Sequence, residues 1–324
     1  MKNVQVLLPG SMTPLVVQGV SDAFTVRHLE KGTDREAFLR KHGAGIRGVA
    51  STGSHGPIGA TLFDQLPKLE IVSHFGVGYD NVDVEEAGRR GIVVTNTPGV
   101  LTDEVADLTL GLLIATVREL PRAEQHLRTG EWRKQSYPLT ATLRNRSVGI
   151  LGLGRIGQAI ATRCEAFGLT VAYHGRNRQT NSSYEYYSSP YELAQAVDVL
   201  IAVTPGGSET KHLVDAQVLE ALGPDGIFIN VARGSVVDED ALIAALRNKT
   251  ILAAGLDVFD NEPNIRPEFL ELDNAVLLPH VASASVHTRN AMGQLVVDNL
   301  LSWFSGKGAI SPVPELEELA SKRR

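Results

Sequence analysis

The chain has 324 residues, of which 43% are hydrophobic and 21% are charged, a composition typical of a globular protein of about two domains. Its formal net charge is −6, from 31 basic and 37 acidic residues without a dense basic block, which argues against nucleic acid as the main partner. The single Cys164 excludes an internal disulfide, and no apolar run approaches the roughly 20 residues that a membrane span needs.

Short apolar runs alternate with amphipathic segments in the N-terminal third of the chain. The runs predicted as strands are residues 4–8, 25–29, 46–50, 69–73 and 92–95. The segments predicted as helices are residues 34–42, 58–66 and 83–90. This alternation indicates a parallel sheet with helices on both faces. Met1 leads directly into the first run without a secretory pattern, so we expect a cytoplasmic protein without a membrane partner.

A cluster of breakers, Asn-Thr-Pro-Gly at residues 96–99, predicts a domain boundary. After it, Thr102 can cap a long helix whose residues 105, 108, 112 and 115 form an apolar face. A polar, irregular stretch with Trp132 and Tyr137 follows at residues 129–146.

The sequence SVGILGLGRIG at residues 147–157 predicts a strand that turns through three glycines into a helix. In this context Gly-x-Gly-x-x-Gly is the dinucleotide fingerprint. Gly152 permits the turn, Gly154 lets the backbone approach a pyrophosphate, and Gly157 lets the helix press against the strand. The backbone N–H groups at the helix start then face the anion, so the cofactor-binding residues expected here are Gly152, Leu153, Gly154, Arg155, Ile156 and Gly157.

A second series of strands and helices follows the fingerprint. The predicted strands are residues 170–174, 198–204, 226–231, 251–258 and 275–278, and the predicted helices are residues 189–196, 215–222 and 238–248. A further long helix at residues 285–304 is expected to return to the first domain, and the tail from Ser311 is expected to pack loosely. Both halves are therefore predicted to be doubly wound α/β sheets, with the functional site in a cleft between them.

Five motifs together identify a family. They are FGVGYD (residues 75–80), the fingerprint, NVARG (residues 230–234), LDVFDNEP (residues 256–263) and LPH (residues 278–280). In this order they resemble the D-isomer-specific 2-hydroxyacid dehydrogenases, over residues 69 to 306. The sequences NTPGVLT (residues 96–102) and TRNAM (residues 288–292) favour the glyoxylate/hydroxypyruvate reductase branch, which includes plant hydroxyphenylpyruvate reductases.

The resemblance implies a fold and a set of site residues. Residues 1–99 and 288–324 would form a discontinuous, flavodoxin-like substrate domain, and residues 100–287 a Rossmann cofactor domain. The backbone at Gly76, Val77 and Gly78 would receive the substrate carboxylate, for which exposed N–H groups are suited. The cofactor would be lined by Thr102, Thr204, Pro205, Val231, Ala232 and Asp257. The family also implies a homodimer, paired through the long helix at Thr102 and the stretch containing Trp132.

Three side chains have the chemistry that reduction of a 2-oxo acid requires. Arg233 follows a predicted strand, and its planar fork suits a carboxylate and the adjacent carbonyl oxygen. His280 also ends a strand and can donate a proton near neutral pH. Glu262 can hydrogen-bond the imidazole and orient it. In the resembling family the matching positions form the catalytic set. No metal site is predicted.

The residue after the second strand of the cofactor domain indicates which cofactor binds. An NAD-binding unit carries Asp or Glu there to bind the ribose hydroxyls. Here Gly175 takes that position and Arg176 follows it. Glycine leaves room for a 2′-phosphate and Arg176 can pair with it, so NADPH is the preferred cofactor and NADH remains possible.

Two other interpretations stay open. One is a different D-2-hydroxyacid specificity, for an arylpyruvate, phosphoglycerate or D-lactate, because no motif places the walls of the substrate pocket. The other is a regulator that binds a dinucleotide with little turnover, like the C-terminal-binding corepressors that resemble this family. Reduction of small 2-oxo acids, glyoxylate and hydroxypyruvate, is the favoured interpretation.

Overall fold

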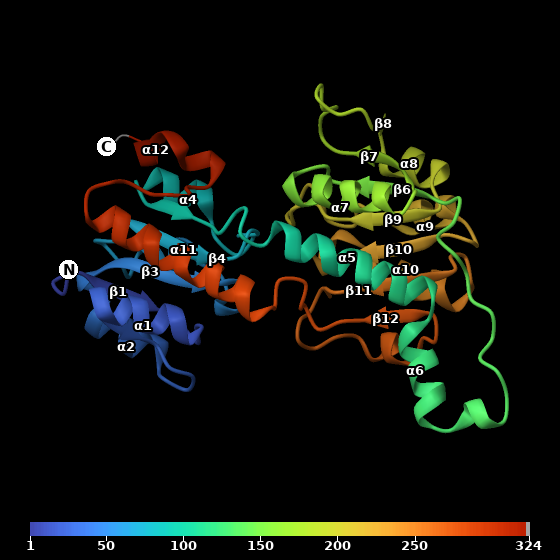
Figure 1. Cartoon of the computed structure of the whole chain (residues 1–324). Coiled ribbons are helices and arrows are strands. Elements are labelled where there is room, and N and C mark those ends of the chain that lie inside the picture. Colours follow the sequence, from blue (N-terminus) through green and yellow to red (C-terminus); the bar gives the residue numbers. More distant parts are fainter. Residues whose placement is uncertain (322–324) are drawn as a thin grey trace. The chain divides into compact units, whose positions relative to one another are not determined.

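The computed structural model describes residues 1–321 and divides the chain into two compact units (Figure 1). The first unit comprises Met1–Leu101 and the segment from Ser285 onward, and the second comprises Thr102–Ala284. The sequence placed these boundaries after residue 99 and before residue 288. In the described part of the chain, no helix is long and apolar enough to cross a membrane.

The first unit is built on a five-stranded parallel sheet with strand order β2-β1-β3-β4-β5. Its strands are β1 (Gln5–Leu8), β2 (Thr25–His28), β3 (Ile46–Thr52), β4 (Ile71–Phe75) and β5 (Val93–Thr95). The helices are α1 (Pro14–Ala23), α2 (Arg35–His42), α3 (Ala60–Phe63), α4 (Val84–Arg89), α11 (Val286–Phe304) and α12 (Glu317–Ser321), and the 3-10 turns are η1 (Gly43–Gly45), η2 (Gly53–His55) and η6 (Pro314–Leu316). The strand order is that of a flavodoxin-like doubly wound sheet.

Helices cover both faces of this sheet, as the sequence predicted (Figure 1). α11 packs against α1 and β4, where Ser73 Oγ donates a hydrogen bond of 3.0 Å to Val296 O. On the opposite face, Leu39 of α2 and Phe63 of α3 are buried in one apolar cluster with strand residues such as Leu7 and Val72. Burial of these apolar helix faces against the sheet stabilises the unit through the hydrophobic effect.

The expectation of a loosely packed tail is wrong for its described part. Val313 is completely buried and Leu316 nearly so, in the same cluster as Phe63. Val313 N also donates a hydrogen bond of 3.0 Å to Val94 O of β5. The two prolines and scattered charges of the tail suggested loose packing, and the apolar pair that packs at the edge of the sheet was overlooked.

The second unit is built on a seven-stranded parallel sheet with strand order β12-β11-β10-β9-β6-β7-β8. Its strands are β6 (Ser147–Leu151), β7 (Thr170–His174), β8 (Glu185–Tyr187), β9 (Val199–Ala202), β10 (Ile227–Asn230), β11 (Ala253–Leu256) and β12 (Ala275–Leu277). The helices are α5 (Thr102–Val117), α6 (Leu120–Arg128), α7 (Arg155–Ala166), α8 (Pro190–Ala196), α9 (Ala216–Leu222) and α10 (Glu239–Arg247), and the 3-10 turns are η3 (Glu131–Arg133), η4 (Gly234–Val236) and η5 (Pro267–Glu271). The strand order reverses between β6 and β9, and such switch points are where doubly wound sheets bind ligands.

Two strand glycines allow the helices to approach this sheet closely. A Cβ atom at Gly149 of β6 would lie 2.8 Å from Leu193 Cγ of α8, and one at Gly255 of β11 would lie 2.6 Å from Thr116 Oγ1 of α5. α5 and α7 therefore cover one face, and α8 with α9 and α10 the other (Figure 1). This two-sided burial is the architecture that the sequence predicted.

Candidate active site

The glycine fingerprint forms a tight turn at the end of β6. Gly152 has φ 99°, and a Cβ atom there would lie 3.1 Å from Thr204 N and Cα. A Cβ at Gly157 would lie 2.1 Å from Gly152 O, so α7 presses directly on the turn. A Cβ at Gly154 would meet nothing within 4 Å, so the turn has an open side at the first residue of α7.

The residues at this turn fit a dinucleotide. α7 begins at Arg155 and Ile156, and its first N–H groups have no intrahelical acceptor, the arrangement that binds a pyrophosphate. Thr204 follows β9 on the other side of the switch point, and its buried hydroxyl has no hydrogen-bond partner within residues 1–321. Leu153 is buried, and its carbonyl accepts a hydrogen bond of 2.6 Å from Gln179 Nε2. A bound cofactor would supply the partners that the Thr204 hydroxyl and the helix start lack.

The turn after β7 carries the predicted 2′-phosphate residues. Gly175 leaves open space, since the nearest atom to a Cβ there would be Asn177 O at 4.0 Å. Arg176 is largely exposed, and its Nη1 lies 3.0 Å from Glu209 Oε2. Glu209 comes from the loop after β9 that also contains Thr204 and Pro205. Glu209 was not predicted as a site residue, because its ion pair joins the loops after β7 and β9, which meet only in the folded chain.

His280 and Glu262 form a hydrogen-bonded pair. His280 Nδ1 lies 2.7 Å from Glu262 Oε2, and the other carboxylate oxygen accepts a hydrogen bond of 2.9 Å from Phe259 N. A carboxylate can only accept, so Nδ1 carries a hydrogen and Nε2 is the ring nitrogen left for another partner. Burial raises the pKa of Glu262, but the hydrogen bonds from His280 and Phe259 and the charges of His280 and Arg233 outweigh it, and the pKa lies below its usual value. Glu262 is therefore a carboxylate at neutral pH.

Arg233 is held next to this pair by its neighbours in the chain. Asn230 Nδ2 donates to Arg233 O at 2.9 Å, and Asn230 Oδ1 accepts from Ala232 N at 3.0 Å, which fixes the turn after β10. A Cβ at Gly234 would lie 1.9 Å from Phe259 C, so this turn is packed on the segment that leads to Glu262. Only glycine permits that contact, and it brings the Arg233 and Glu262 segments together.

Asp257 fixes the backbone of His280. Its carbonyl accepts a hydrogen bond of 2.8 Å from His280 N, and its carboxylate accepts bonds of 2.7 and 2.9 Å from Val281 N and Ala282 N. Burial raises the pKa of Asp257 more than these backbone hydrogen bonds lower it. His280 has φ 54°, a left-handed conformation that a non-glycine residue adopts only when its surroundings hold it. The resemblance suggested a cofactor contact for Asp257 and gave no sign of this anchoring role.

The remaining predicted residues of the second unit flank these positions. Val231 and Ala232 are buried directly after β10, and Thr102 is the first residue of α5. In the described residues, no group of three or more His, Cys, Asp or Glu side chains is arranged to hold a metal ion.

In the first unit, Gly76, Val77 and Gly78 form a loop directly after β4. Gly76 N donates to Thr97 Oγ1 at 3.1 Å, and Asn96 Nδ2 donates to Val77 O at 2.9 Å. The amides of Val77 and Gly78 have no acceptor among the described residues and are the two donors that an anion can use.

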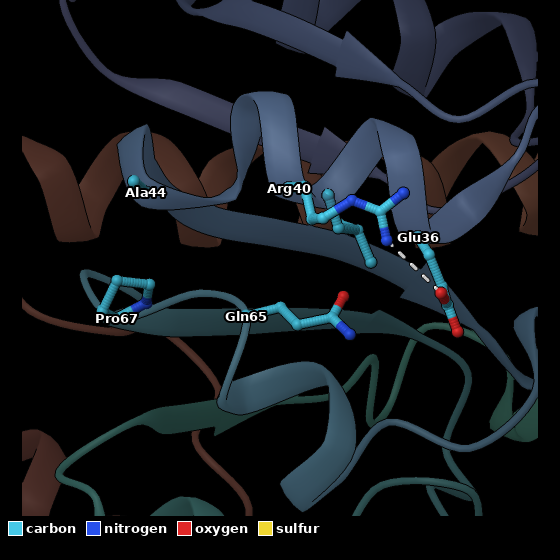
Figure 2. A pocket seen from close by; sticks show the side chains of 6 residues that line it. Glu36, Arg40, Ala44, Gln65 and Pro67 are labelled. Carbon is cyan, nitrogen blue, oxygen red and sulfur yellow. Dashed lines mark hydrogen bonds and ion pairs between the residues drawn. The ribbon is translucent and has the colours of Figure 1, made fainter.

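The first unit also has a small surface pocket of about 270 Å³, shown in Figure 2. It is lined by residues of α2 and of the segment after α3, including the Arg40–Glu36 ion pair. None of the predicted site residues lines it, and it has no part in the site described above.

The fold and this constellation define a dinucleotide-binding α/β protein with the residues of a dehydrogenase. The family model for the NAD-binding domain of D-isomer-specific 2-hydroxyacid dehydrogenases matches residues 110–282. The chain is 42% identical to a glyoxylate/hydroxypyruvate reductase of Arabidopsis thaliana, over 97% of this chain and all of that protein. It is equally identical to a 2-ketogluconate reductase of Gluconobacter oxydans, over 93% of this chain and 96% of that protein. The chain belongs to the D-isomer-specific 2-hydroxyacid dehydrogenase family.

A solved structure supports the same assignment. It is an NADPH-dependent glyoxylate/hydroxypyruvate reductase from Sinorhizobium meliloti in complex with NADP and malonate. It superimposes with a TM-score of 0.92 at 50% identity and covers 97% of both chains. The identification made from five sequence motifs is confirmed.

Proposed function

We propose that this protein is an NADPH-dependent reductase of small 2-oxo acids, with glyoxylate and hydroxypyruvate as substrates and D-2-hydroxy acids as products. The observation that carries the proposal is the His280–Glu262 hydrogen bond of 2.7 Å with Arg233 held beside it. Relatives that are named glyoxylate/hydroxypyruvate reductases support the substrate class.

Each residue has a role that follows from its contacts. Arg233 holds the substrate carboxylate and the carbonyl oxygen through its fork of N–H donors. The free amides of Val77 and Gly78 donate to the carboxylate. His280, protonated on both ring nitrogens, donates the proton on Nε2 to the carbonyl oxygen, and Glu262 stabilises the imidazolium through Nδ1. The bound cofactor supplies the hydride.

Cofactor preference rests on the turn after β7. Gly175 leaves space and Arg176 supplies a cation, whereas a carboxylate at this position would repel a 2′-phosphate. The NADP complex of the Sinorhizobium meliloti relative supports NADPH, and NADH remains a possible second cofactor.

A second specificity has support of its own. Relatives at 42% identity include a hydroxyphenylpyruvate reductase from Plectranthus scutellarioides and the 2-ketogluconate reductase, whose named substrates are bulkier than glyoxylate. Each named substrate carries a 2-oxo group beside a carboxylate, so its reduction needs the same hydride and proton transfers. A non-catalytic regulator, the other interpretation of the sequence, predicts dinucleotide binding without turnover.

We also propose a homodimer. α6 and the segment after it expose large apolar side chains in the single chain, namely Leu120, Leu127, Trp132 and Leu139. A second copy would cover them, in keeping with the pairing that the family resemblance implies. The cytoplasmic location expected from the sequence is part of this proposal, and cell fractionation tests it.

The proposal is tested by steady-state assays of a panel of 2-oxo acids with NADPH and with NADH. The panel is glyoxylate, hydroxypyruvate, hydroxyphenylpyruvate, 2-ketogluconate and pyruvate, with methyl pyruvate as the neutral counterpart. We expect the highest kcat/KM with glyoxylate or hydroxypyruvate and NADPH, and little reduction of the ester. Tight NADPH binding without turnover of any acid would favour the regulator instead.

A further inference from the structure

The C-terminal tail (residues 311–321) contacts the loop that is proposed to receive the substrate carboxylate. We infer that the tail positions this carboxylate loop (residues 76–79) through Glu315 and Ser311, and thereby sets the affinity for the 2-oxo acid. The inference rests on the proposed function, since it assumes that the loop binds the carboxylate.

The carboxylate loop is held at its start by the chain after β5. Gly76 donates its N–H to Thr97 Oγ1 at 3.1 Å and accepts a hydrogen bond of 2.9 Å from Thr97 N. Val77 O accepts from Asn96 Nδ2 at 2.9 Å. These bonds use every polar backbone group of Gly76 and the carbonyl of Val77. The direction of the free Val77 and Gly78 amides therefore depends on the contacts that hold the two ends of the loop.

The tail supplies the support at the other end of the loop. Tyr79 OH lies 3.2 and 3.1 Å from the two carboxylate oxygens of Glu315. Burial, followed by the charge and hydrogen bond of Glu315, raises the pKa of Tyr79 to about 12. The phenol therefore remains a donor throughout the neutral range, and the bond to a carboxylate is charge-assisted. Tyr79 directly follows Gly78, whose amide is one of the two free donors.

The tail also holds Asn96, which supports the start of the loop. Asn96 N donates to Ser311 O at 3.2 Å, and Ser311 Oγ donates to Asn96 O at 2.7 Å. Asn96 is the residue whose side chain holds Val77. Ser311 therefore acts on the loop through Asn96, and Glu315 acts on it through Tyr79.

The tail itself is fixed to α11 by Asn299. This side chain is completely buried, and its Oδ1 accepts hydrogen bonds of 3.0 Å from Ile310 N and from Ser311 N. Its Nδ2 donates to Leu295 O at 2.8 Å and to Ser311 Oγ at 2.9 Å. A buried amide whose oxygen and nitrogen both make hydrogen bonds fixes the backbone that it contacts in one conformation. A continuous chain of hydrogen bonds therefore runs from α11 through Ser311 and Asn96 to the loop.

The stabilising and positioning contacts of the tail can be separated by mutation. Val313 and Leu316 are buried apolar residues, so they anchor the tail and contribute to stability. Glu315 is exposed, and exposed polar contacts contribute little to the free energy of unfolding. Loss of the Glu315 carboxylate should therefore move the loop without unfolding the unit.

The test compares Glu315→Ala, Glu315→Gln and Tyr79→Phe with wild type, and Glu317→Ala serves as the matched control. Glu317 is an exposed acidic residue of the same tail, without a hydrogen bond or ion pair to another described side chain. The measurements are kcat, KM for glyoxylate, KM for NADPH, the inhibition constant of oxamate (a carboxylate that cannot be reduced), and Tm.

We expect Glu315→Ala and Tyr79→Phe to raise KM for glyoxylate and the oxamate constant about three- to tenfold, or about 0.7–1.4 kcal/mol. KM for NADPH and Tm should stay at wild-type values, and the double variant should be no worse than either single one. Glu315→Gln keeps an acceptor for the phenol and should restore most of the affinity. Glu317→Ala should match wild type throughout.

Two results would overturn the inference. One is a Glu315→Ala variant with unchanged glyoxylate and oxamate constants, and the other is an effect of equal size in Glu317→Ala. Failure of the proposed function is distinguishable from both, because the wild type would then show no preference for glyoxylate over a neutral 2-oxo ester.

Discussion

His280 and Glu262 are 18 positions apart in the chain, yet His280 Nδ1 and Glu262 Oε2 lie 2.7 Å apart. The pair is fixed from both sides, because Phe259 N holds the carboxylate and Asp257 holds the backbone at His280. The imidazole consequently has one nitrogen engaged and one available, which is the arrangement that a general acid requires.

Removal of the imidazole should abolish most of the turnover. We expect His280→Ala to lower kcat about 10²- to 10⁴-fold, because His280 is the proposed proton donor to the carbonyl oxygen. His212→Ala is the control, since that side chain is as exposed as His280 and lies 3.9 Å from a carboxylate oxygen of Asp238. A folded His280→Ala enzyme with near wild-type kcat would rule out the assignment.

Glu262→Gln should change the pH dependence of both rate and stability. A neutral amide no longer stabilises the imidazolium, so reduction should be fast over a narrower pH range. The pKa of Glu262 in the folded protein lies below its ordinary 4.5, so its stabilising contribution is present above that pH and is lost as pH falls through the lowered pKa. Urea denaturation should therefore show wild type to be more stable than Glu262→Gln at pH 7, with a smaller difference below pH 4.5. A difference that is constant over this range would contradict the prediction.

Arg233→Ala should raise KM for the 2-oxo acid and lower kcat together, because the fork contacts both the carboxylate and the carbonyl oxygen on which charge develops. A charge-assisted contact corresponds to about 1.5–3 kcal/mol, or roughly a ten- to hundredfold loss in kcat/KM. Arg233→Lys keeps the charge without the fork and should be intermediate. Arg247→Ala removes an arginine paired with Glu271 on the surface and should leave the kinetics unchanged.

The sequence predicted both sheets, apart from the edge strand β8, because strands and helices alternate in it with clear apolar periodicity. It missed α1, although Pro14 is a suitable first helical residue and Val16 and Val20 supply a buried face. It also missed α6, whose apolar residues Leu120 and Leu127 remain exposed in the single chain. α6 has only two leucines among its nine residues, too few to give the repeated apolar face from which the other helices were predicted.

The site was predictable where motifs carry it and not where long-range contacts build it. Arg233, Glu262 and His280, the predicted catalytic set, each lie in a recognisable motif that follows a strand. The role of Asp257 in holding His280, and the Arg176–Glu209 ion pair, arise from segments that meet only in the folded chain. The apolar periodicity that predicts helices and strands contains no information on such long-range side-chain contacts.

The proposed dimer predicts a solution mass of about twice the 34.9 kDa of one chain. Light scattering at micromolar protein should give that mass for wild type and a monomer for Leu127→Asp with Trp132→Ser, because charge and polarity at these sites oppose burial. Leu270→Ser changes an exposed leucine of the same unit outside α6 and should remain dimeric. A wild-type mass near 34.9 kDa would refute the dimer.

The turn after β7 gives a prediction for cofactor choice. If Gly175 and Arg176 bind the 2′-phosphate, NADPH should exceed NADH in kcat/KM by about tenfold, the lower end for an arginine contact, because Arg176 is mostly exposed. Gly175→Asp with Arg176→Ile should reverse the preference by restoring a hydroxyl acceptor and removing the cation. The change should appear mainly in KM, since the phosphate lies far from the hydride and binds ground and transition states alike.

Glu209 provides a second test of the contact between Arg176 and the 2′-phosphate. Its carboxylate is 3.0 Å from Arg176 and would compete with the phosphate for the guanidinium. Glu209→Gln should therefore lower KM for NADPH several-fold and leave KM for NADH nearly unchanged, because Glu209 pairs with Arg176, which only the 2′-phosphate of NADPH is proposed to engage. In an Arg176→Ile background the same substitution should have a much smaller effect on NADPH. Equal efficiency with both cofactors in wild type, together with no response to Glu209→Gln, would mean that Arg176 does not bind the phosphate.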